Sequence, residues 1–286
     1  MSDFQTFRYR LRLTGRLRLE TALRVGSGLT DELSGTDIAV VKDAQRRPYI
    51  PGSSFKGALR AHIERLVRSV ESEFGSGKGA CNPMRDEERC IPSKPVDSRV
   101  SIEQLRRNFE NNPSGLDDEL YCLSCRVCRV FGSPWLASKV LVKDLLLAEP
   151  ELWFDRRYQV RHGVGIERDS ETASRGLLYD YEAVPAGTEF RWEIVIENAD
   201  RERAEDGLVI WGLREFANGR VRLGGGRSRG LGWVTLTFDE YAEEVDATDR
   251  QALLDYLTTG RGRLVSHDEV LARAATFARM LAGEEG

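Results

Sequence analysis

The stretch Pro51-Gly52-Ser53-Ser54-Phe55-Lys56-Gly57-Ala58-Leu59-Arg60 joins a turn to the start of a helix. A proline-glycine pair marks the turn, and Ser53 or Ser54 is a typical N-cap residue. Apolar residues then recur at helical spacing, so we expect a helix that runs to about residue 73. The N–H groups of a helix N-terminus favour anions, and Lys56 adds positive charge beside them. The stretch therefore predicts an anion site.

Upstream of this turn, residues 25–36 form a loop rich in glycine and serine, and residues 37–42 read as a short apolar strand. Asp37 lies at the junction of the two. A lone acid in such a loop commonly caps a turn, and Asp31 and Asp43 lie nearby. By itself, Asp37 predicts no particular chemistry.

Further upstream, residues 7–23 alternate with a period of two, which is typical of a strand with one buried face. Apolar side chains fall on odd positions, and arginines fall on even ones. The arginines are Arg8, Arg10, Arg12, Arg16 and Arg18. A charged strand face often serves solubility only. No acid interrupts these five, so we interpret the face as strongly basic.

The composition is that of a water-soluble globular chain, with 286 residues, 41% hydrophobic and 31% charged. No apolar run reaches the roughly 20 residues that cross a bilayer, and the N-terminus has no signal pattern, so we expect a cytoplasmic protein without membrane contact. The net charge of −4 argues against nucleic acid, but residues 1–60 carry 11 basic and 6 acidic side chains. Residues 234–286 carry 5 basic and 11 acidic side chains. The acidic tail therefore conceals, in the net charge, that the body of the chain is basic.

Residues 74–130 are too polar to build a core and contain all five cysteines, which predicts a metal that staples this insertion. Four thiolates form a closed, structural zinc site. The favoured ligands are Cys90, Cys122, Cys125 and Cys128. The rival set replaces Cys122 with Cys81. An iron–sulfur cluster is less favoured, because the usual x-x-x-Cys-Pro does not follow.

Near the C-terminal side, residues 223–233 combine glycines with arginines. Gly225 and Gly226 would allow a ligand close to the backbone, and Arg227 and Arg229 suit phosphate. No Gly-Lys-Ser/Thr follows, so this is not a P-loop. The alternative is a plain turn before a strand.

The order of elements is strand, helix, strand, then strand, helix, strand, which predicts an α+β fold with a ferredoxin-like (RRM-like) core. The expected elements are residues 7–23, 53–73, 138–147, 190–196, 203–217 and 234–238. Residues 1–286 would form one elaborated domain. Its insertions would be residues 74–130 and 150–187, and residues 241–286 would form an acidic helical tail.

These motifs together resemble the RAMP superfamily, the repeat-associated proteins of CRISPR systems, and in particular the backbone subunits of type III effector complexes. The matching stretches occur in family order and cover most of the chain to about residue 240. They are residues 35–60, 125–133, 165–173, 182–188 and 224–232. The cysteine-rich insertion resembles that of zinc-bearing members.

The resemblance implies a protein that lines up with other CRISPR effector subunits along a guide RNA (crRNA) and cleaves single-stranded target RNA in antiviral defence. Asp37 matches the loop aspartate that members need for metal-dependent cleavage, with a divalent cation such as magnesium. A thumb hairpin within residues 154–180 would wedge into the guide–target duplex, with His162 as a duplex contact. The guide would be gripped by Ser53, Ser54, Lys56, Arg60, Gly225, Gly226, Arg227 and Arg229.

Three alternatives remain open at this point. The chain could be a catalytically inactive structural RNA-binding subunit of the same kind of complex. It could be a metal-independent RAMP ribonuclease that processes guide precursors, although such enzymes use a His or Tyr base and the three histidines form no motif. A zinc-ribbon DNA-binding protein would leave the two glycine-containing, phosphate-directed stretches unexplained.

Overall fold

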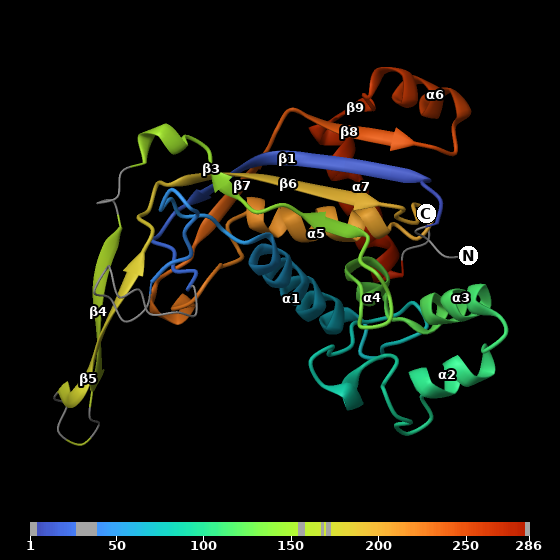
Figure 1. Cartoon of the computed structure of the whole chain (residues 1–286), viewed down its shortest axis with the longest axis horizontal. Helices are drawn as coiled ribbons and strands as arrows, with labels where there is room; N and C mark the ends of the chain where they lie inside the picture. The colour runs from blue at the N-terminus through green and yellow to red at the C-terminus, as the bar shows by residue number, and fades with distance from the viewer. Residues whose placement is uncertain (1–4, 27–38, 154–157, 167–168, 170–172, 284–286) are drawn as a thin grey trace.

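A seven-stranded antiparallel sheet, covered on one face by helices, forms the body of the molecule (Figure 1). The computed structural model describes residues 5–26, 39–153, 158–166, 169 and 173–283. The sheet order is β2-β6-β1-β8-β9, with β3 also paired to β6 and β7 to β1. Among the described residues, no helix has the length and apolar character that crossing a bilayer requires. The sheet and the helices that cover it make this a mixed α/β fold.

The central strand is β1 (Tyr9–Leu19), whose odd positions are buried, as the alternation predicts. Along one edge it pairs with β6 (Glu189–Glu197). The other edge is shared, because β7 (Val234–Phe238) pairs with its second half and β8 (Tyr241–Asp246) with its first. Gly15 lies where no side chain fits, since a Cβ there would approach the Thr237 carbonyl oxygen to 2.0 Å.

Three helices cover the core face of the sheet: α1 (Gly52–Val70), α5 (Glu205–Ala217) and α7 (His267–Ala282) (Figure 1). Their buried side chains pack with those of β1 and β6 in one hydrophobic cluster. The predicted serine caps of α1 are wrong, because Pro51 occupies the N-cap position and no side chain caps the helix. Helix α1 also ends at Val70, three residues before the expected end.

The segment 74–130 contains a short 3-10 turn (η1, Asp86–Glu88) and three helices, α2 (Ile102–Asn108), α3 (Pro113–Leu123) and α4 (Arg126–Phe131). A second small cluster joins four buried cysteines to apolar residues of these helices, which packs the segment beside the end of α1.

A long hairpin, β4 (Gln159–Ile166) with β5 (Ala173–Ala183), projects from the opposite end of the molecule (Figure 1). It follows two short strands, β2 (Val140–Val142) and β3 (Leu146–Leu147), and a 3-10 turn, η2 (Pro150–Leu152). The predicted strand at residues 37–42 is not seen in its described part. Residues 39–42 form only isolated bridges, from Val40 to Gly26 and from Lys42 to Pro48.

Residues after 240 are more than a helical tail. Two helices are present, α6 (Arg250–Thr259) and α7, but two strands accompany them, β8 and β9 (Arg263–Ser266). Strand β8 pairs with the free half of β1, and β9 pairs with β8 at the edge of the sheet. Helix α7 buries Val270, Ala274 and Phe277 in the main core.

Candidate nucleic-acid interface and metal centre

Loops from distant parts of the chain meet at the base of the hairpin. Leu23 and Val184 exchange two backbone hydrogen bonds, of 2.9 and 2.8 Å, which join the chain after β1 to the end of β5. Gly225 donates its backbone N–H to the carbonyl of Arg24 at 2.8 Å. The glycine-arginine stretch and the hairpin are therefore held against the same short segment.

Asp37, the predicted catalytic acid, lies outside the described residues. The chain on both sides of its loop is fixed beside Arg24, because Gly26 forms a bridge with Val40. In addition, Val41 donates its N–H to the Val25 carbonyl at 2.9 Å. The loop that carries Asp37 thus starts and ends at the base of the hairpin.

Glu182 is a buried carboxylate at this base that the sequence did not single out as functional. It accepts a hydrogen bond from the Val40 N–H at 3.3 Å and pairs with Lys42 Nζ at 2.8 Å. Lys42 also lies 4.5 Å from the ring centroid of Tyr158. Glu182 therefore ties the chain just after the Asp37 loop to strand β5. The signal in the sequence that could have identified Glu182 is its place in residues 182–188, one of the stretches that carry the family resemblance.

The glycine-arginine stretch forms an exposed 3-10 turn, η4 (Arg227–Arg229), between residues with left-handed backbone conformations. Gly224 has φ +72°, and a Cβ there would approach the Arg24 carbonyl oxygen to 2.2 Å, so this glycine serves chain packing. Gly225 is exposed, and a Cβ there would make only ordinary contacts with Arg24, at 3.9 Å or more. Arg229 hydrogen-bonds the Tyr179 hydroxyl on the hairpin.

A basic pocket of about 480 Å³ lies between α1 and this stretch. It is lined by Ala58, Ala61, His62, Arg65, Arg220, Val221, Arg222, Arg227 and Ser228. Arg220 pairs with Glu215 at 2.9 Å, whereas Arg65, Arg222 and Arg227 have no ion pair among the described residues. Burial lowers the pKa of His62, as does nearby Arg65. Unpaired guanidinium groups around a pocket are suited to phosphate.

The sequence predicts a free anion site at the start of α1, and the structure differs from this prediction. Ser53 and Ser54 are exposed, but the N–H of Gly52 already donates to the Asp144 carboxylate at 2.7 Å. Lys56 turns inward, with Nζ 2.7 Å from Ser138 Oγ, and burial lowers its pKa. The Lys56 ammonium, which the sequence predicts to lie beside RNA, therefore hydrogen-bonds within the protein instead.

Arg60, one turn further along α1, is also engaged inside the protein. Its Nη1 donates to the Gly132 carbonyl at 3.0 Å, its Nε to Glu64 Oε1 at 2.7 Å, and its Nη2 to Cys128 Sγ at 3.4 Å. The side chain is 19% exposed. The guanidinium is therefore fixed between α1 and the cysteine-rich segment.

Three of the five arginines on the predicted basic face of β1 form ion pairs with described residues. They pair with glutamates on the neighbouring strands. These pairs are Arg10–Glu197 at 2.7 Å, Arg12–Glu193 at 3.0 Å and Arg16–Glu189 at 3.0 Å. The interpretation as a strongly basic surface is wrong for these three, because β6 supplies the acids: Glu197 lies directly opposite Arg10, and Glu193 and Glu189 lie diagonally across from Arg12 and Arg16.

His162 lies on β4, exposed on the projecting hairpin. Its Nδ1 is 2.5 Å from Asp180 Oδ1, directly across the hairpin on β5. The pair holds the imidazole in a defined orientation on a surface that the body of the molecule leaves open.

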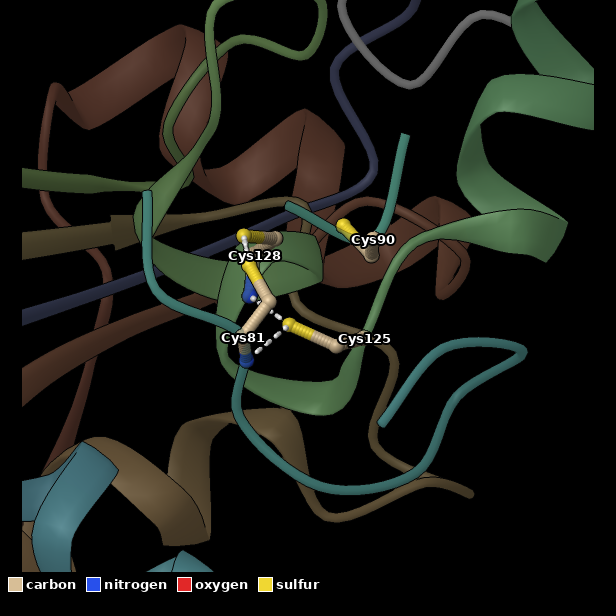
Figure 2. Close-up of side chains that lie close together, drawn as sticks. All are labelled: Cys81, Cys90, Cys125 and Cys128. Carbon is tan, nitrogen blue, oxygen red and sulfur yellow. Dashed lines mark hydrogen bonds between the residues drawn. The ribbon is translucent and has the colours of Figure 1, made fainter. Parts of the chain in front are cut away.

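The cysteine cluster brings together Cys81, Cys90, Cys125 and Cys128, whose sulfurs all lie within 4.8 Å of one another (Figure 2). All four are buried. Cys122 is exposed on α3, so the favoured ligand set is corrected to the rival set, with Cys81 in place of Cys122. Residue spacing could not decide this, because it does not tell which way α3 faces.

This cluster has the donors of a metal site. Cys125 Sγ accepts the N–H groups of Cys81 and Cys128, each at 3.5 Å, as a thiolate that ligates a metal can. Within the part of the chain that the structure describes, no other group of three or more His, Cys, Asp or Glu side chains is gathered this way. Four buried thiols at these distances could hold a metal such as zinc.

Comparisons with known proteins agree with the motifs. The family model of the RAMP superfamily matches residues 16–235. The chain is similar to the CRISPR system Cms endoribonuclease Csm3 of Methanocaldococcus jannaschii, with 27% identity over 239 residues, 80% of this chain and 79% of the relative. The protein of the same name from Methanothermobacter thermautotrophicus is 24% identical over 246 residues, 78% of this chain and 81% of that one.

Proposed function

The chain belongs to the RAMP superfamily, and on this premise we propose that it is a guide-RNA-binding backbone subunit of a type III CRISPR effector complex that cleaves target RNA. The main support for this proposal is that about four fifths of the chain is similar to two proteins named CRISPR endoribonucleases. The family match also spans the Asp37 loop, the cysteine cluster and the glycine-arginine stretch. The partners would be guide RNA, single-stranded target RNA and the other effector subunits.

In this proposal the core is ferredoxin-like and forms one domain over residues 1–286. Strand β1, helix α1 and strand β2 would make the first half, and β6, α5 and β7 the second. Residues 74–130 would be a zinc-holding insertion, and residues 150–187 would carry the thumb. Residues 241–286 would add an acidic extension to this core.

Guide RNA would bind over the basic pocket between α1 and η4. Exposed Ser53 and Ser54 and the arginines of η4 offer hydrogen bonds to phosphates. Gly225, whose N–H is already donated to Arg24, and Gly226 would let the RNA backbone come close to the chain. Arg227 lines the pocket, and Arg229 lies against the hairpin. Lys56 and Arg60 would support α1 from within. Contacts to phosphate and sugar without base readout suit a protein that accepts many guide sequences.

The hairpin β4–β5 would be the thumb that wedges into the guide–target duplex. It projects from the body, and Val160 and Val164 are half exposed on it (Figure 1). Apolar side chains of this kind can separate stacked bases. His162, oriented by Asp180, would contact the duplex beside them. A target strand displaced in this way would be kinked near the base of the hairpin.

Asp37 would act at that kink, because its loop starts and ends at the hairpin base. The target's 2′-hydroxyl would attack the adjacent phosphorus and lose its proton to solvent water, and the 5′-oxygen would leave, taking a proton from water, to give a 2′,3′-cyclic phosphate and a 5′-hydroxyl. Asp37 would hold a divalent cation such as magnesium there, which supplies stabilisation of the negative charge on the phosphate. The need for a 2′-hydroxyl restricts cleavage to RNA.

The metal in the cysteine cluster would be structural zinc, bound by Cys81, Cys90, Cys125 and Cys128. Such a site has four protein ligands and no open position for catalysis. It would stabilise a segment whose own apolar cluster is small. Zinc binding contributes on the order of 10 kcal/mol to folding in small domains of this kind.

The deciding experiment compares wild type with Asp37→Ala in complexes reconstituted with guide RNA. We expect equal guide binding, and target cleavage only by wild type with magnesium. Cleavage by Asp37→Ala at the same sites would refute the role of Asp37. A wild-type complex that assembles but never cuts would support the inactive structural subunit. Cleavage of guide precursor in EDTA would instead support the processing ribonuclease.

A further inference from the structure

The cysteine cluster, once it holds a divalent metal, is a buried anion. Four thiolates around zinc carry a net charge of about −2. All four cysteines are at most 8% exposed, so water contributes little to stabilising this charge. Hydrogen bonds and cations of the protein must therefore do so.

Two of the sulfurs receive their hydrogen bonds in different ways. Cys125 Sγ accepts two backbone N–H groups, which bring partial positive charge only. Cys128 Sγ accepts Nη2 of Arg60 at 3.4 Å, which brings a full charge. A cation beside a metal-bound thiolate lowers the cost of its burial.

Arg60 is held in place for this contact. Its Nε donates to Glu64 at 2.7 Å, and its Nη1 donates to the Gly132 carbonyl just after α4 at 3.0 Å. Arg68, on the same face of α1, also contacts Glu64 but donates to the backbone carbonyls of Ala80 and Cys81. Both arginines hold the cysteine-bearing loops against α1, but of the two, Arg60 contacts a sulfur that would bind the metal.

We propose that Arg60 is the counter-cation of the Cys81–Cys90–Cys125–Cys128 metal centre, a positioning residue that stabilises the bound thiolate of Cys128 and fixes the centre to α1. This inference rests on the proposed zinc site, and it removes Arg60 from the residues that grip guide RNA. Three of the five N–H donors of Arg60 already serve a carboxylate, a carbonyl and a sulfur, and the side chain is only 19% exposed, so Arg60 is poorly placed to bind a phosphate.

The test measures zinc affinity and RNA binding on the full chain with Arg60→Gln, Arg60→Lys and, as a matched control on the same helix, Arg65→Gln. Zinc affinity comes from competition with a chromophoric chelator, and the cobalt-substituted protein reports the thiolate environment by its charge-transfer band. We expect Arg60→Gln to lose about 10- to 100-fold in zinc affinity and to shift the band. Arg60→Lys, which keeps the charge, should lose less, and Arg65→Gln should match wild type.

Measurement of RNA binding by the same variants distinguishes an arginine that contacts phosphate from one that stabilises the metal centre. Each lost phosphate contact reduces the slope of log K against log salt by about 0.7 for single strands. We expect Arg65→Gln, which lines the basic pocket, to reduce this slope and Arg60→Gln to leave it unchanged. Unaltered zinc affinity in Arg60→Gln would overturn the inference while the zinc site stands. A wild-type chain that binds neither zinc nor cobalt would overturn both.

Discussion

Arg12 on β1 and Glu193 on β6 form a two-pronged ion pair across the open face of the sheet, with Nε–Oε1 at 3.0 Å and Nη2–Oε2 at 3.1 Å. The hydrogen bond from Arg12 lowers the pKa of Glu193. Arg12 Nη1 also lies 3.5 Å from Glu243 on β8. An arginine held between two acids is poorly placed to bind a third anion.

Arg12→Gln should therefore leave guide-RNA binding unchanged. Arg227→Gln removes an arginine of the same size that lines the basic pocket and has no ion pair among the described residues, so it should weaken binding. We expect the salt slope to fall by about 0.7 in Arg227→Gln alone. Titration of both variants with a single-stranded RNA at several salt concentrations checks this, and a reduced slope in Arg12→Gln would restore the sheet face as an RNA surface.

The arginines of β1 could be predicted from the sequence, but their acidic partners could not. Strict periodicity predicts β1 and α1 to within about four residues at each end, because burial of one face dictates the spacing of apolar residues. It could not reveal that Glu193 lies diagonally across from Arg12, opposite Thr14, since the register between strands about 180 residues apart is set by the whole core. Types of residue were predictable, but their pairing across the fold was not.

The elements that were missed have a common cause. Strand β8 contains Glu243 and Glu244 in succession, which reads as an exposed helix or loop. In the structure Glu244 is buried with Arg273 at 2.7 Å and Arg263 at 2.5 Å, so its charge is matched by residues that come later in the chain. Helix α4 is only six residues long and owes its position to the cysteines at its start. Neither depends on local periodicity.

Cys81→Ser and Cys122→Ser should differ sharply, although both remove a thiol from the same segment. Cys81 lies within the cluster, with its sulfur 3.5 Å from that of Cys128, whereas Cys122 is exposed. Wild type and Cys122→Ser should carry about one zinc per chain, as a single closed site requires. Cys81→Ser should lose zinc and melt at a lower temperature. Metal analysis with thermal unfolding decides between the two ligand sets, and the reverse pattern would reinstate Cys122.

Lys139→Met should cost about 3–5 kcal/mol, because it leaves Glu205 buried without its cation. The two side chains are 2% and 5% exposed and lie 2.8 Å apart. Glu205 also accepts from the Tyr121 hydroxyl at 2.6 Å and from the Asp200 N–H at 2.7 Å, so it links α3 to the start of α5. Urea denaturation of the purified chain measures the loss.

A second variant tests whether the unpaired charge is the cause. Glu205→Gln removes the negative charge and keeps one carbonyl oxygen, which can accept from the Asp200 N–H while the amide NH2 donates to the Tyr121 hydroxyl oxygen. Lys139→Met with Glu205→Gln should therefore be more stable than Lys139→Met alone. If the double variant is the less stable of the two, lost packing by the lysine stem explains the cost better than charge does.

Helix α7 lies beyond the stretch that the family model matches, which ends at residue 235, yet it packs like a core helix. Phe277 is 1% exposed, and its ring centroid is 5.4 Å from that of Trp211 on α5. The two helices approach closely at Gly207, where a Cβ would come 2.5 Å from the Arg273 carbonyl oxygen. The extension is therefore built into the fold and does not merely follow it.

Phe277→Ala should accordingly destabilise the whole protein by about 3–5 kcal/mol, the usual cost of removing a large aromatic side chain from a core. Leu257→Ala on α6 is the matched control, because Leu257 is 68% exposed and its truncation should change stability by less than about 0.5 kcal/mol. Urea denaturation followed by the fluorescence of the five tryptophans, which include buried Trp192 and half-buried Trp211, measures both. A single cooperative transition shifted to lower urea in Phe277→Ala means that α7 unfolds together with the sheet. If α7 were a separate appendage, Phe277→Ala would leave the main transition in place, and the buried contact with α5 would contribute nothing to the stability of the core.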